Sequence, residues 1–341
     1  MQRSRIANKP EQRRLDLVVE RWTMSEPIEI AGHRIVDPEL IVVTVTDAGR
    51  SGRGEALGVY YHGDTTSRLA SQVESVRQEI EAGAGRQELQ RLLPPGGARN
   101  ALDCALWDLD AKLLGESVYE MAGVERRGRV PTTYTLAVGT PEAMATKAVK
   151  AYRDAVAIKV KLLGDGLDCA RLAAIRAARP DVWLGVDANQ SYSRTLLVES
   201  MPTFVELGVQ LVEQPCRIGE EDQLDGIEWA IPLVADESVQ SLTDIDALVG
   251  RFQMVNIKLD KCGGLTEGLL MARRAQALGL GVMVGNMGGT SLGMAPGLVL
   301  GQLCDLVDLD GPLFLKRDRE PGICYDAGYV SAPKALWGWP A

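Results

Sequence analysis

Short apolar segments recur at a nearly constant spacing from about residue 132 to residue 310. Each is brief, rich in Val, Ile and Leu, and followed by a stretch with apolar residues at helical spacing, so each predicts a β-strand followed by a helix. The strands are expected to end near Leu136, Lys161, Asp187, Glu213, Asp236, Lys258, Val284 and Asp310, which are 22 to 26 residues apart. Eight such units in series predict a (β/α)8 barrel, with a doubly wound parallel sheet as the alternative.

The residues before this repeat predict a different kind of structure. Residues 15–20 and 40–46 are expected to be strands, and a turn at Asp47-Ala48-Gly49 leads into a returning strand near 54–56. A polar loop is expected over 24–32, and apolar residues at helical spacing predict helices over 67–81 and 98–114. This region therefore predicts a small α+β domain of about 120 residues.

Composition excludes several classes of function. Lys and Arg total 37 and Asp and Glu total 46, giving a net charge of −9, and no basic stripe is present, which argues against a nucleic-acid partner. The only histidines are His33 and His62, which leaves almost no material for His-based triads or His-rich zinc sites, so proton transfer must rely mainly on Lys, Asp, Glu, Tyr or Cys.

The sequence also predicts a location in the cell. The six cysteines are far apart and never form a C-x-x-C pair, which predicts reduced thiols in a cytoplasmic protein. The N-terminus has no apolar core of a signal peptide. Residues 275–304 carry no charge, but glycines and Pro296 interrupt them well before a membrane-spanning length, so no membrane partner is expected.

Charged residues stand at the predicted carboxyl ends of the strands. Strands of a parallel barrel are buried on both faces, so a charged side chain there is costly unless it faces a site. Asp187, Glu213 and Asp236 end three neighbouring strands. Oxygen ligands from adjacent rigid elements suit a hard divalent cation, so we predict Mg²⁺, with Mn²⁺ as second choice. The alternative is that each acid forms an ion pair with a lysine or arginine at the rim.

Three lysines share this predicted edge. Lys159 and Lys161 are two residues apart, so they point to the same face of the second strand, and Lys258 ends the sixth strand, across the barrel. Amines on opposite sides of a bound substrate can remove and return a proton at one carbon, provided that nearby positive charge lowers the pKa of the lysine that acts as base. The same spacing equally suits lysines that only neutralise the acids.

In their order and spacing, five short motifs resemble the muconate-lactonizing subgroup of the enolase superfamily. They are Lys159-x-Lys161, Asp187-x-Asn189, Glu213-Gln214-Pro215, Ala235-Asp236-Glu237 and Asn256-Ile257-Lys258. The helix over 101–112 resembles the segment that joins this family's capping domain to its barrel. The resemblance implies a capping domain over 1–124, in which 1–14 is a loose tail, a catalytic (β/α) barrel over 125–312, and a C-terminal segment over 313–341 that returns to the capping domain.

The resemblance also implies a metal centre and a proton shuttle. Asp187, Glu213 and Asp236 would bind Mg²⁺, and Asn189 would contact these ligands without binding the metal itself. Lys161 and Lys258 would be the acid/base pair that flanks a carboxylate substrate, and Lys159 would stabilise an enediolate electrostatically. The implied reaction is removal of the proton α to the carboxylate and return of a proton to the other face. The scarcity of histidine fits this version with two lysines.

A further pair of acids narrows the substrate. Asp308-Leu309-Asp310, followed by Gly311-Pro312, resembles the Asp-x-Asp of dipeptide epimerases, in which two carboxylates hold the free α-ammonium group. This implies a small-molecule dipeptide substrate that is epimerised at its C-terminal residue. One of the two acids could instead cap the turn before Gly311. With this pair, the expected site has five acids and three lysines, a formal charge of −2 that one Mg²⁺ would cancel.

Other members of the superfamily remain alternatives. A cycloisomerase, an o-succinylbenzoate synthase or an N-acylamino acid racemase would use the same metal and lysines, and a non-catalytic binding protein is a further alternative. A homo-oligomer is left open by the sequence.

Two departures from the family pattern bear on the substrate. Gly289 stands where related enzymes often have a glutamate, and the nearby Thr290 and Ser291 are expected to donate hydrogen bonds to the substrate carboxylate. The early loop over 22–34, which in this family covers the site and reads the substrate side chain, has Arg21 and Arg34 at its two ends as the nearest arginines. The dipeptide is therefore not specified as Ala-Glu.

Overall fold

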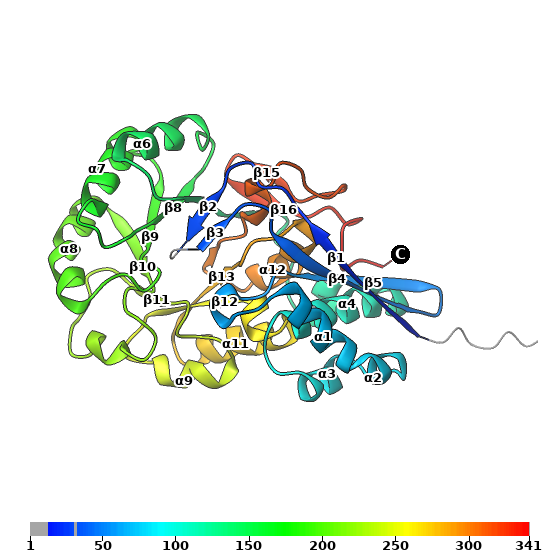
Figure 1. Ribbon diagram of the computed structural model, residues 1–341. Helices are drawn as coiled ribbons and strands as arrows, with labels where there is room; N and C mark the ends of the chain where they lie inside the picture. The colour runs from blue at the N-terminus through cyan, green and yellow to red at the C-terminus, as the bar shows by residue number, and fades with distance from the viewer. Residues whose placement is uncertain (1–12, 31–32, 341) are drawn as a thin grey trace, which may run out of the picture.

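Eight parallel strands, each hydrogen-bonded to the next in chain order, form the centre of the structure, a computed structural model that describes residues 13–30 and 33–340 (Figure 1). They are β7 (Thr133–Leu136), β8 (Ala157–Lys161), β9 (Trp183–Asp187), β10 (Val209–Glu213), β11 (Leu233–Ala235), β12 (Met254–Lys258), β13 (Gly281–Gly285) and β14 (Leu306–Val307). A doubly wound sheet would reverse its strand order at one point. The predicted barrel is therefore confirmed, and seven of the eight strand ends fall within one residue of the predicted position.

Helices cover the outside of the barrel. They are α6 (Pro141–Lys150), α7 (Asp168–Ala178), α8 (Arg194–Glu206), α9 (Ile245–Leu248), α10 (Leu259–Cys262), α11 (Leu265–Ala277) and α12 (Ser291–Gly301). Between β10 and β11 the described chain has a short 3-10 helix, η2 (Glu221–Leu224), in place of an α-helix. The barrel is thus a modified (β/α)8 barrel, whose strands are buried because the helices cover one face and the opposite strands cover the other.

Side chains close the barrel between its first and last strands. The Thr133 hydroxyl donates to Asp308 Oδ1 at 2.5 Å, and the backbone N–H of Thr135 donates to Asp310 Oδ2 at 2.7 Å. The predicted end of the last strand at Asp310 is three residues late, because β14 has only two residues. Beyond it, these carboxylates make the bonds to β7 that backbone groups make elsewhere in the barrel.

The N-terminal unit is an antiparallel sheet with helices on one face. Its strands are β1 (Arg14–Arg21), β4 (Glu39–Asp47) and β5 (Arg50–Ala56), in the order β1-β4-β5. The long helix α4 (Gly97–Leu114) packs on β5. A Cβ atom on Gly52 or Gly54 would lie only 2.1 or 2.0 Å from a carbonyl oxygen of this helix. The two glycines therefore allow the helix to lie directly against the strand.

The N-terminal unit differs from expectation at two places. The segment predicted as a loop contains a two-stranded hairpin of β2 (Ile28–Ile30) and β3 (His33–Ile35). The helix predicted over 67–81 is broken at Val76 into α1 (Thr66–Ser75) and α2 (Arg77–Glu81). Shorter elements complete the unit: η1 (Tyr60–His62), α3 (Arg86–Leu92) and α5 (Val118–Ala122). The tail expected over 1–14 lies outside the described residues except for its last two positions.

The chain after the barrel packs on both parts of the molecule. The 3-10 helix η4 (Gly311–Phe314) is followed by β15 (Cys324–Asp326) and β16 (Tyr329–Ser331), and β16 pairs with β6 (Val130–Pro131). Beyond them, Trp337 Nε1 donates to the carbonyl of Arg53 at 2.8 Å, and Gly338 N donates to Asp108 at 2.8 Å. Among residues 13–30 and 33–340, no helix has both the length and the apolar content needed to cross a membrane.

A buried acid joins the N-terminal unit to the barrel. Asp260 in α10 accepts a hydrogen bond from Gly58 N at 3.0 Å, and burial raises its pKa to about 7. The folded protein therefore holds this proton more tightly than the unfolded chain does. The stabilisation that this confers is complete below about pH 4 and is lost as the pH rises to about 7.

Asp260→Asn removes this ionisation and keeps an oxygen for Gly58. As the pH rises from 5 to 8, the melting temperature of the variant relative to that of the parent protein is expected to increase by about 4 °C. Thermal unfolding followed by circular dichroism at both pH values measures the gain. The control is Asp246→Asn, which removes an exposed acid paired with Arg274. A difference between variant and parent that does not change with pH would contradict the expectation.

Candidate active site

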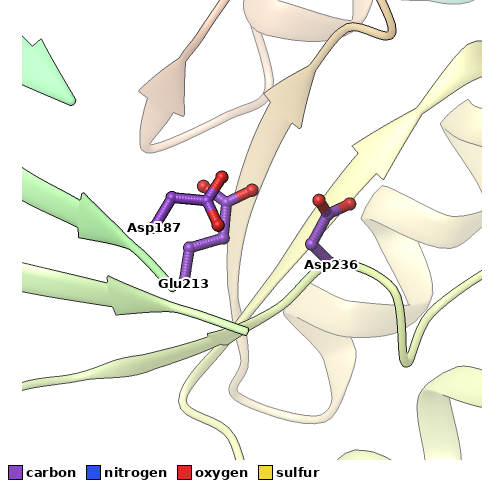
Figure 2. Close-up of side chains that lie close together, drawn as sticks. All are labelled: Asp187, Glu213 and Asp236. Carbon is purple, nitrogen blue, oxygen red and sulfur yellow. The ribbon is translucent and has the colours of Figure 1, made fainter. Parts of the chain in front are cut away.

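Three buried carboxylates meet at one end of the barrel. Asp187 and Glu213 end β9 and β10, and Asp236 follows β11 directly. One oxygen of each lies within 4.8 Å of the others, and the side chains are at most 1% exposed. Figure 2 shows the three carboxylates at the ends of neighbouring strands, turned toward a common space. The barrel thus brings together the three acids that the sequence predicted as metal ligands.

The surroundings give the three carboxyl groups different pKa values. Burial, reinforced by the charge of Asp187, raises the pKa of Glu213 to about 8. Burial also acts to raise the pKa of Asp236, but Lys258 and Lys261 lower it far below its usual range. At Asp187 the lysines at 161 and 159 likewise outweigh burial, and its pKa is lowered. A cation among the three oxygens would relieve the repulsion that raises the pKa of Glu213.

Each predicted lysine contacts one or more of these acids. Lys161 Nζ lies 2.6 Å from Asp187 Oδ2, and Lys258 Nζ lies 2.7 Å from Asp236 Oδ2. Lys159 Nζ lies 3.1 Å from Glu213 Oε2 and also forms an ion pair with Asp308. Because β8 and β12 are four strands apart in the sheet, Lys161 and Lys258 approach the carboxylates from opposite sides.

Burial and the nearby acids shift the pKa of two of these lysines in opposite directions. Burial lowers the pKa of Lys258, but Asp236 and Glu213 raise it well above its usual value. Asp308 and Glu213 do the same for Lys159, which is 2% exposed. Lys159 is therefore held as a cation by the acids around it.

Sequence reasoning missed two charged residues of this site. Lys261 Nζ lies 2.6 Å from Asp236 Oδ1, so Asp236 is bound by two lysines. Lys261 stands one helical turn after Lys258, and this spacing was its only signal. Glu237 ends the Ala235-Asp236-Glu237 motif, in which only Asp236 had a predicted role. It is 2% exposed, and burial together with Asp236 raises its pKa to about 7. With both added, the site has six acids and four lysines, so its formal charge stays at −2.

Asn189 contacts two charged groups beside the carboxylates. Its Oδ1 accepts a hydrogen bond from Lys161 Nζ at 2.9 Å, and its Nδ2 donates to Glu237 Oε1 at 3.2 Å. The sequence predicted that Asn189 supports the metal ligands. Its backbone N–H donates to Asp187 Oδ1 at 2.9 Å, and its side chain also lies beside a lysine of the proposed acid/base pair.

A cavity that opens to solvent lies between the barrel and the N-terminal unit, and its space, open solvent included, is about 940 Å³. Its polar lining includes all three predicted lysines and both acids of the Asp-x-Asp pair, and Asn189, Asp236 and Glu237 line it as well. Ala137 and Met287 of the barrel contribute to its apolar lining, but most of that lining comes from the N-terminal unit and the chain after β14: Met24, Ile35, Pro38, Leu57, Tyr60, Tyr61, Phe314 and Leu315. The backbone bond from Ser25 N to Phe314 O, 2.7 Å long, ties these two parts of the wall together.

The two acids of the Asp-x-Asp pair differ in their bonds. Asp308 forms an ion pair with Lys159 and accepts a hydrogen bond from the Thr133 hydroxyl. Asp310 accepts one bond from Thr135 N at 2.7 Å and a longer one, 3.4 Å, from Asn286 Nδ2. Burial and the charge of Asp308 raise the pKa of Asp310 to about 6. Asp310 therefore has more capacity left to accept hydrogen bonds from a ligand.

Thr290 and Ser291 do not line this cavity. The Thr290 hydroxyl donates to Glu55 of β5, and the Ser291 hydroxyl donates to Asp318 in the C-terminal segment. Arg319 Nη2 also contacts Glu55 Oε2 at 2.8 Å, so these residues join the N-terminal unit to the barrel. We therefore leave Thr290 and Ser291 out of the proposed substrate contacts.

The structure around Gly289 disfavours a side chain at this position. A Cβ atom on it would lie 2.8 Å from Glu55 Oε1, and its φ of +118° strains any other residue. A side chain at position 289 would therefore require the Glu55 side chain to shift.

The arginines near the early loop do not line the cavity. Arg21 lies 3.9 Å from Asp37, and Arg34 is exposed. The residues between them, 22–33, include neither lysine nor arginine. Within the described lining the only cations are the three lysines that already contact acids.

Comparison with known protein families finds two matches that together cover most of the chain. Residues 13–123 match the family described as mandelate racemase / muconate lactonizing enzyme, N-terminal domain. Residues 143–334 match the family described as enolase C-terminal domain-like.

Two characterised proteins are similar over nearly their whole length. The L-Ala-D/L-Glu epimerase of Escherichia coli (strain K12) is 38% identical over 310 residues, which are 91% of this chain and 96% of that protein. The N-acetyl-D-glutamate racemase of a Pseudoalteromonas species is 38% identical over 305 residues, which are 88% of this chain and 95% of that protein.

Solved structures are similar in fold as well. One is an enolase family member from Agrobacterium tumefaciens with homology to dipeptide epimerases, solved with sodium and L-Ala-L-Glu; the TM-score is 0.90 at 37% identity, over 96% of this chain and 100% of that one. Another is a dipeptide epimerase from Methylococcus capsulatus complexed with Mg and L-Arg-D-Lys, with a TM-score of 0.88 at 29% identity, over 94% of this chain and 97% of that one.

Proposed function

The chain belongs to the mandelate racemase / muconate lactonizing enzyme family of the enolase superfamily, and from this membership we propose that it is a Mg²⁺-dependent dipeptide epimerase. The observation that carries the proposal is the position of Lys161 and Lys258. They contact the carboxylate cluster from opposite sides, and both line the cavity. A carbon held between them can lose a proton to one amine and gain one from the other, which inverts its configuration.

The buried carboxylates fit Mg²⁺. Asp187, Glu213 and Asp236 supply three hard oxygen ligands from rigid strand ends, and one side of the cluster faces the cavity. When bound, Mg²⁺ would supply positive charge that offsets these carboxylates and stabilises the negative charge that develops on the substrate carboxylate.

The side chains around this cluster have separate roles in proton transfer and in stabilising charge. Lys161 and Lys258 take up and release the α-proton on the two faces of the substrate. Lys159, held as a cation between Glu213 and Asp308, adds fixed positive charge on the same side of the cavity as Lys161. The apolar side chains of the wall lower the local dielectric constant, which strengthens each of these electrostatic interactions.

Asp310 is the proposed acceptor for the free α-ammonium group of the dipeptide. Asp310→Asn removes the negative charge but keeps the size of the side chain. We expect kcat/KM for a dipeptide to fall by about 10²-fold, the effect of losing one buried charge-assisted hydrogen bond, and the rate for an N-acetylated amino acid to change less than about threefold. Steady-state kinetics with both substrates measures this.

The comparison uses Asp310 because Asp308 also binds Lys159, so a change at 308 would disturb two functions together. It also separates the proposed activity from racemisation of N-acylamino acids, the activity named for one relative. Equal losses with both substrates, or faster turnover of the acetylated amino acid by the parent enzyme, would favour the racemase.

We further propose that the side chain of the epimerised residue is apolar or aromatic. A substrate carboxylate side chain in this cavity would need a cation, and the three lysines there already contact acids. Leu57, Tyr60, Tyr61 and Met24 offer apolar and aromatic surface instead. Dipeptides such as L-Ala-L-Phe and L-Ala-L-Leu are therefore the expected substrates.

A single screen tests activity and preference together. The protein is incubated with Mg²⁺ and a library of L-Ala-L-Xaa dipeptides in D₂O, and deuterium uptake at the α-carbon is followed by mass spectrometry. We expect the fastest uptake with Phe, Leu, Met or Tyr at the second position. No uptake with any dipeptide would contradict the epimerase activity, and fastest uptake with L-Ala-L-Glu would contradict the apolar preference alone.

We propose a cytoplasmic location because all six cysteines carry free thiols, which suits a reducing compartment.

A further inference from the structure

The turn after β9 directs the Asn189 side chain into the cavity. Asn189 has a φ of +40°, in the left-handed region that asparagine tolerates better than most residues. Its backbone N–H donates to Asp187 Oδ1 at 2.9 Å, which fixes the turn to the carboxylate cluster. The side-chain amide then lies between Lys161 and Glu237.

The two neighbours of this amide determine which way it points. The Lys161 ammonium group can only donate hydrogen bonds, so it requires the amide oxygen, which lies 2.9 Å from Nζ. The ionised Glu237 carboxylate can only accept, so in this form it requires the amide nitrogen, which lies 3.2 Å from Oε1. Glu237 therefore holds the amide in the orientation that presents oxygen to Lys161.

This orientation bears on the lysine when it acts as a base. A neutral amine has two N–H bonds and one lone pair in a tetrahedral arrangement with its carbon. Asp187 Oδ2, at 2.6 Å, and Asn189 Oδ1 accept the two N–H bonds of Lys161. The lone pair must then point in the one direction left. Because Lys161 lines the cavity, this direction is available to a substrate C–H bond.

Lys258 lacks such an arrangement. Its Nζ contacts Asp236 Oδ2 at 2.7 Å, and within residues 13–30 and 33–340 no side-chain amide hydrogen-bonds to it. The hydrogen bonds of Glu237 and Asn189 therefore lead to Lys161 and not to Lys258.

We infer that Glu237 is a positioning residue that acts through Asn189 to aim the Lys161 amine at the α-carbon. This inference rests on the proposed two-lysine epimerisation. In the step concerned, the substrate Cα–H bond breaks, its electron pair stays on the substrate, and the proton forms a new N–H bond on the Lys161 lone pair. Lys258 donates a proton to the opposite face, which completes the inversion.

The inference predicts a loss that is confined to one epimer. In D₂O, washout of the α-proton from the L,L and L,D forms of a dipeptide reports separately on the two lysines, since each epimer presents its α-proton to only one of them. Lys161→Ala identifies which epimer faces Lys161. With L-Ala-L-Phe and L-Ala-D-Phe, or the pair fastest in the library, Glu237→Leu is expected to slow washout from that epimer by about 10- to 100-fold. Washout from the other epimer should change less than about threefold.

Three further variants sharpen this test. Glu237→Gln keeps an oxygen that can accept from Asn189 Nδ2, so it should restore most of the washout. Asn189→Leu should also slow washout from the epimer that faces Lys161 and leave the other epimer nearly unchanged. Adding Glu237→Leu to this variant should slow that washout by no more than about a further twofold, because both substitutions act through the same contact. Glu221→Gln, which removes a carboxylate bonded to Ser238 but not to Asn189, should behave like the parent protein.

The alternatives to this role give different results. Equal slowing of both epimers, with weakened Mg²⁺ binding by calorimetry, would mean that Glu237 acts through the metal centre. A rise in KM with unchanged kcat would mean that Glu237 contacts the substrate. Either result, independent losses in the double variant, or no change would overturn the inference. The parent protein's own washout separates these outcomes from failure of the proposed function, since without that function the parent itself shows none.

Discussion

Lys161→Ala is expected to abolish epimerisation, by about 10³-fold or more, while it leaves α-proton exchange intact for one epimer of the dipeptide. Lys258→Ala is expected to do the same with the epimers reversed. The reason is geometric: β8 and β12 place one amine on each side of the carboxylate cluster, and each amine can reach only one face of the reacting carbon. Inversion needs both lysines, whereas exchange without inversion needs one.

Proton NMR in D₂O measures both processes at once, because loss of the α-proton signal reports exchange and the shift of the product reports inversion. Lys112→Ala is a suitable control, since this partly exposed lysine pairs with Asp108 in the N-terminal unit. If either alanine variant lost exchange from both epimers while binding Mg²⁺ normally, or kept full inversion, the assignment of one lysine to each face would be wrong.

Removal of the divalent cation is expected to stop exchange from both epimers, and addition of Mg²⁺ to a chelator-treated sample is expected to restore it. Neither lysine can compensate, because the charge on the substrate carboxylate would then face Asp187, Glu213 and Asp236 with no cation between them. Glu213→Gln is expected to weaken Mg²⁺ binding and to reduce exchange from both epimers by about 10³-fold.

The metal-free protein should nevertheless remain folded. Four lysines contact the acids of this site, so the cluster is neutralised in part without a cation. Far-ultraviolet circular dichroism before and after chelation checks this point, and calorimetry with Mg²⁺ measures the binding. Undiminished exchange in the presence of excess chelator would rule out the metal-dependent reaction, and Asp246→Asn serves as a matched acid-to-amide control on the surface.

Sequence alone predicted the barrel and most of the charged residues at its mouth, and the physical reason is periodicity. A strand buried on both faces needs an apolar run, and a covering helix needs a dozen or so residues, so the unit length is visible along the chain. Charged residues such as Asp187 and Lys258 stand out at the ends of those runs because nothing in a buried strand explains them. The motifs around them indicated the family, which the comparisons confirm.

Other features depended on contacts between segments that are far apart in the chain. The hydroxyl groups of Thr290 and Ser291 could bind a carboxylate of a substrate. They donate instead to Glu55 and Asp318, which lie 235 and 27 positions away in the chain. The hairpin at 28–35 is too short for a periodic signal. Lys261 belongs to the site only because the first turn after β12 directs its side chain back to Asp236.

The sequence by itself therefore determined the architecture and the acid and lysine residues at the strand ends, since both follow from local burial and spacing. Only the tertiary structure decided which oxygen each lysine contacts, how Asp308 and Asp310 close the barrel, and how Asn189 is held between Lys161 and Glu237. These are directional contacts of a few ångströms between side chains from different strands. No periodic pattern along the chain encodes them, because hydrogen-bond geometry is set only when the strands are in place.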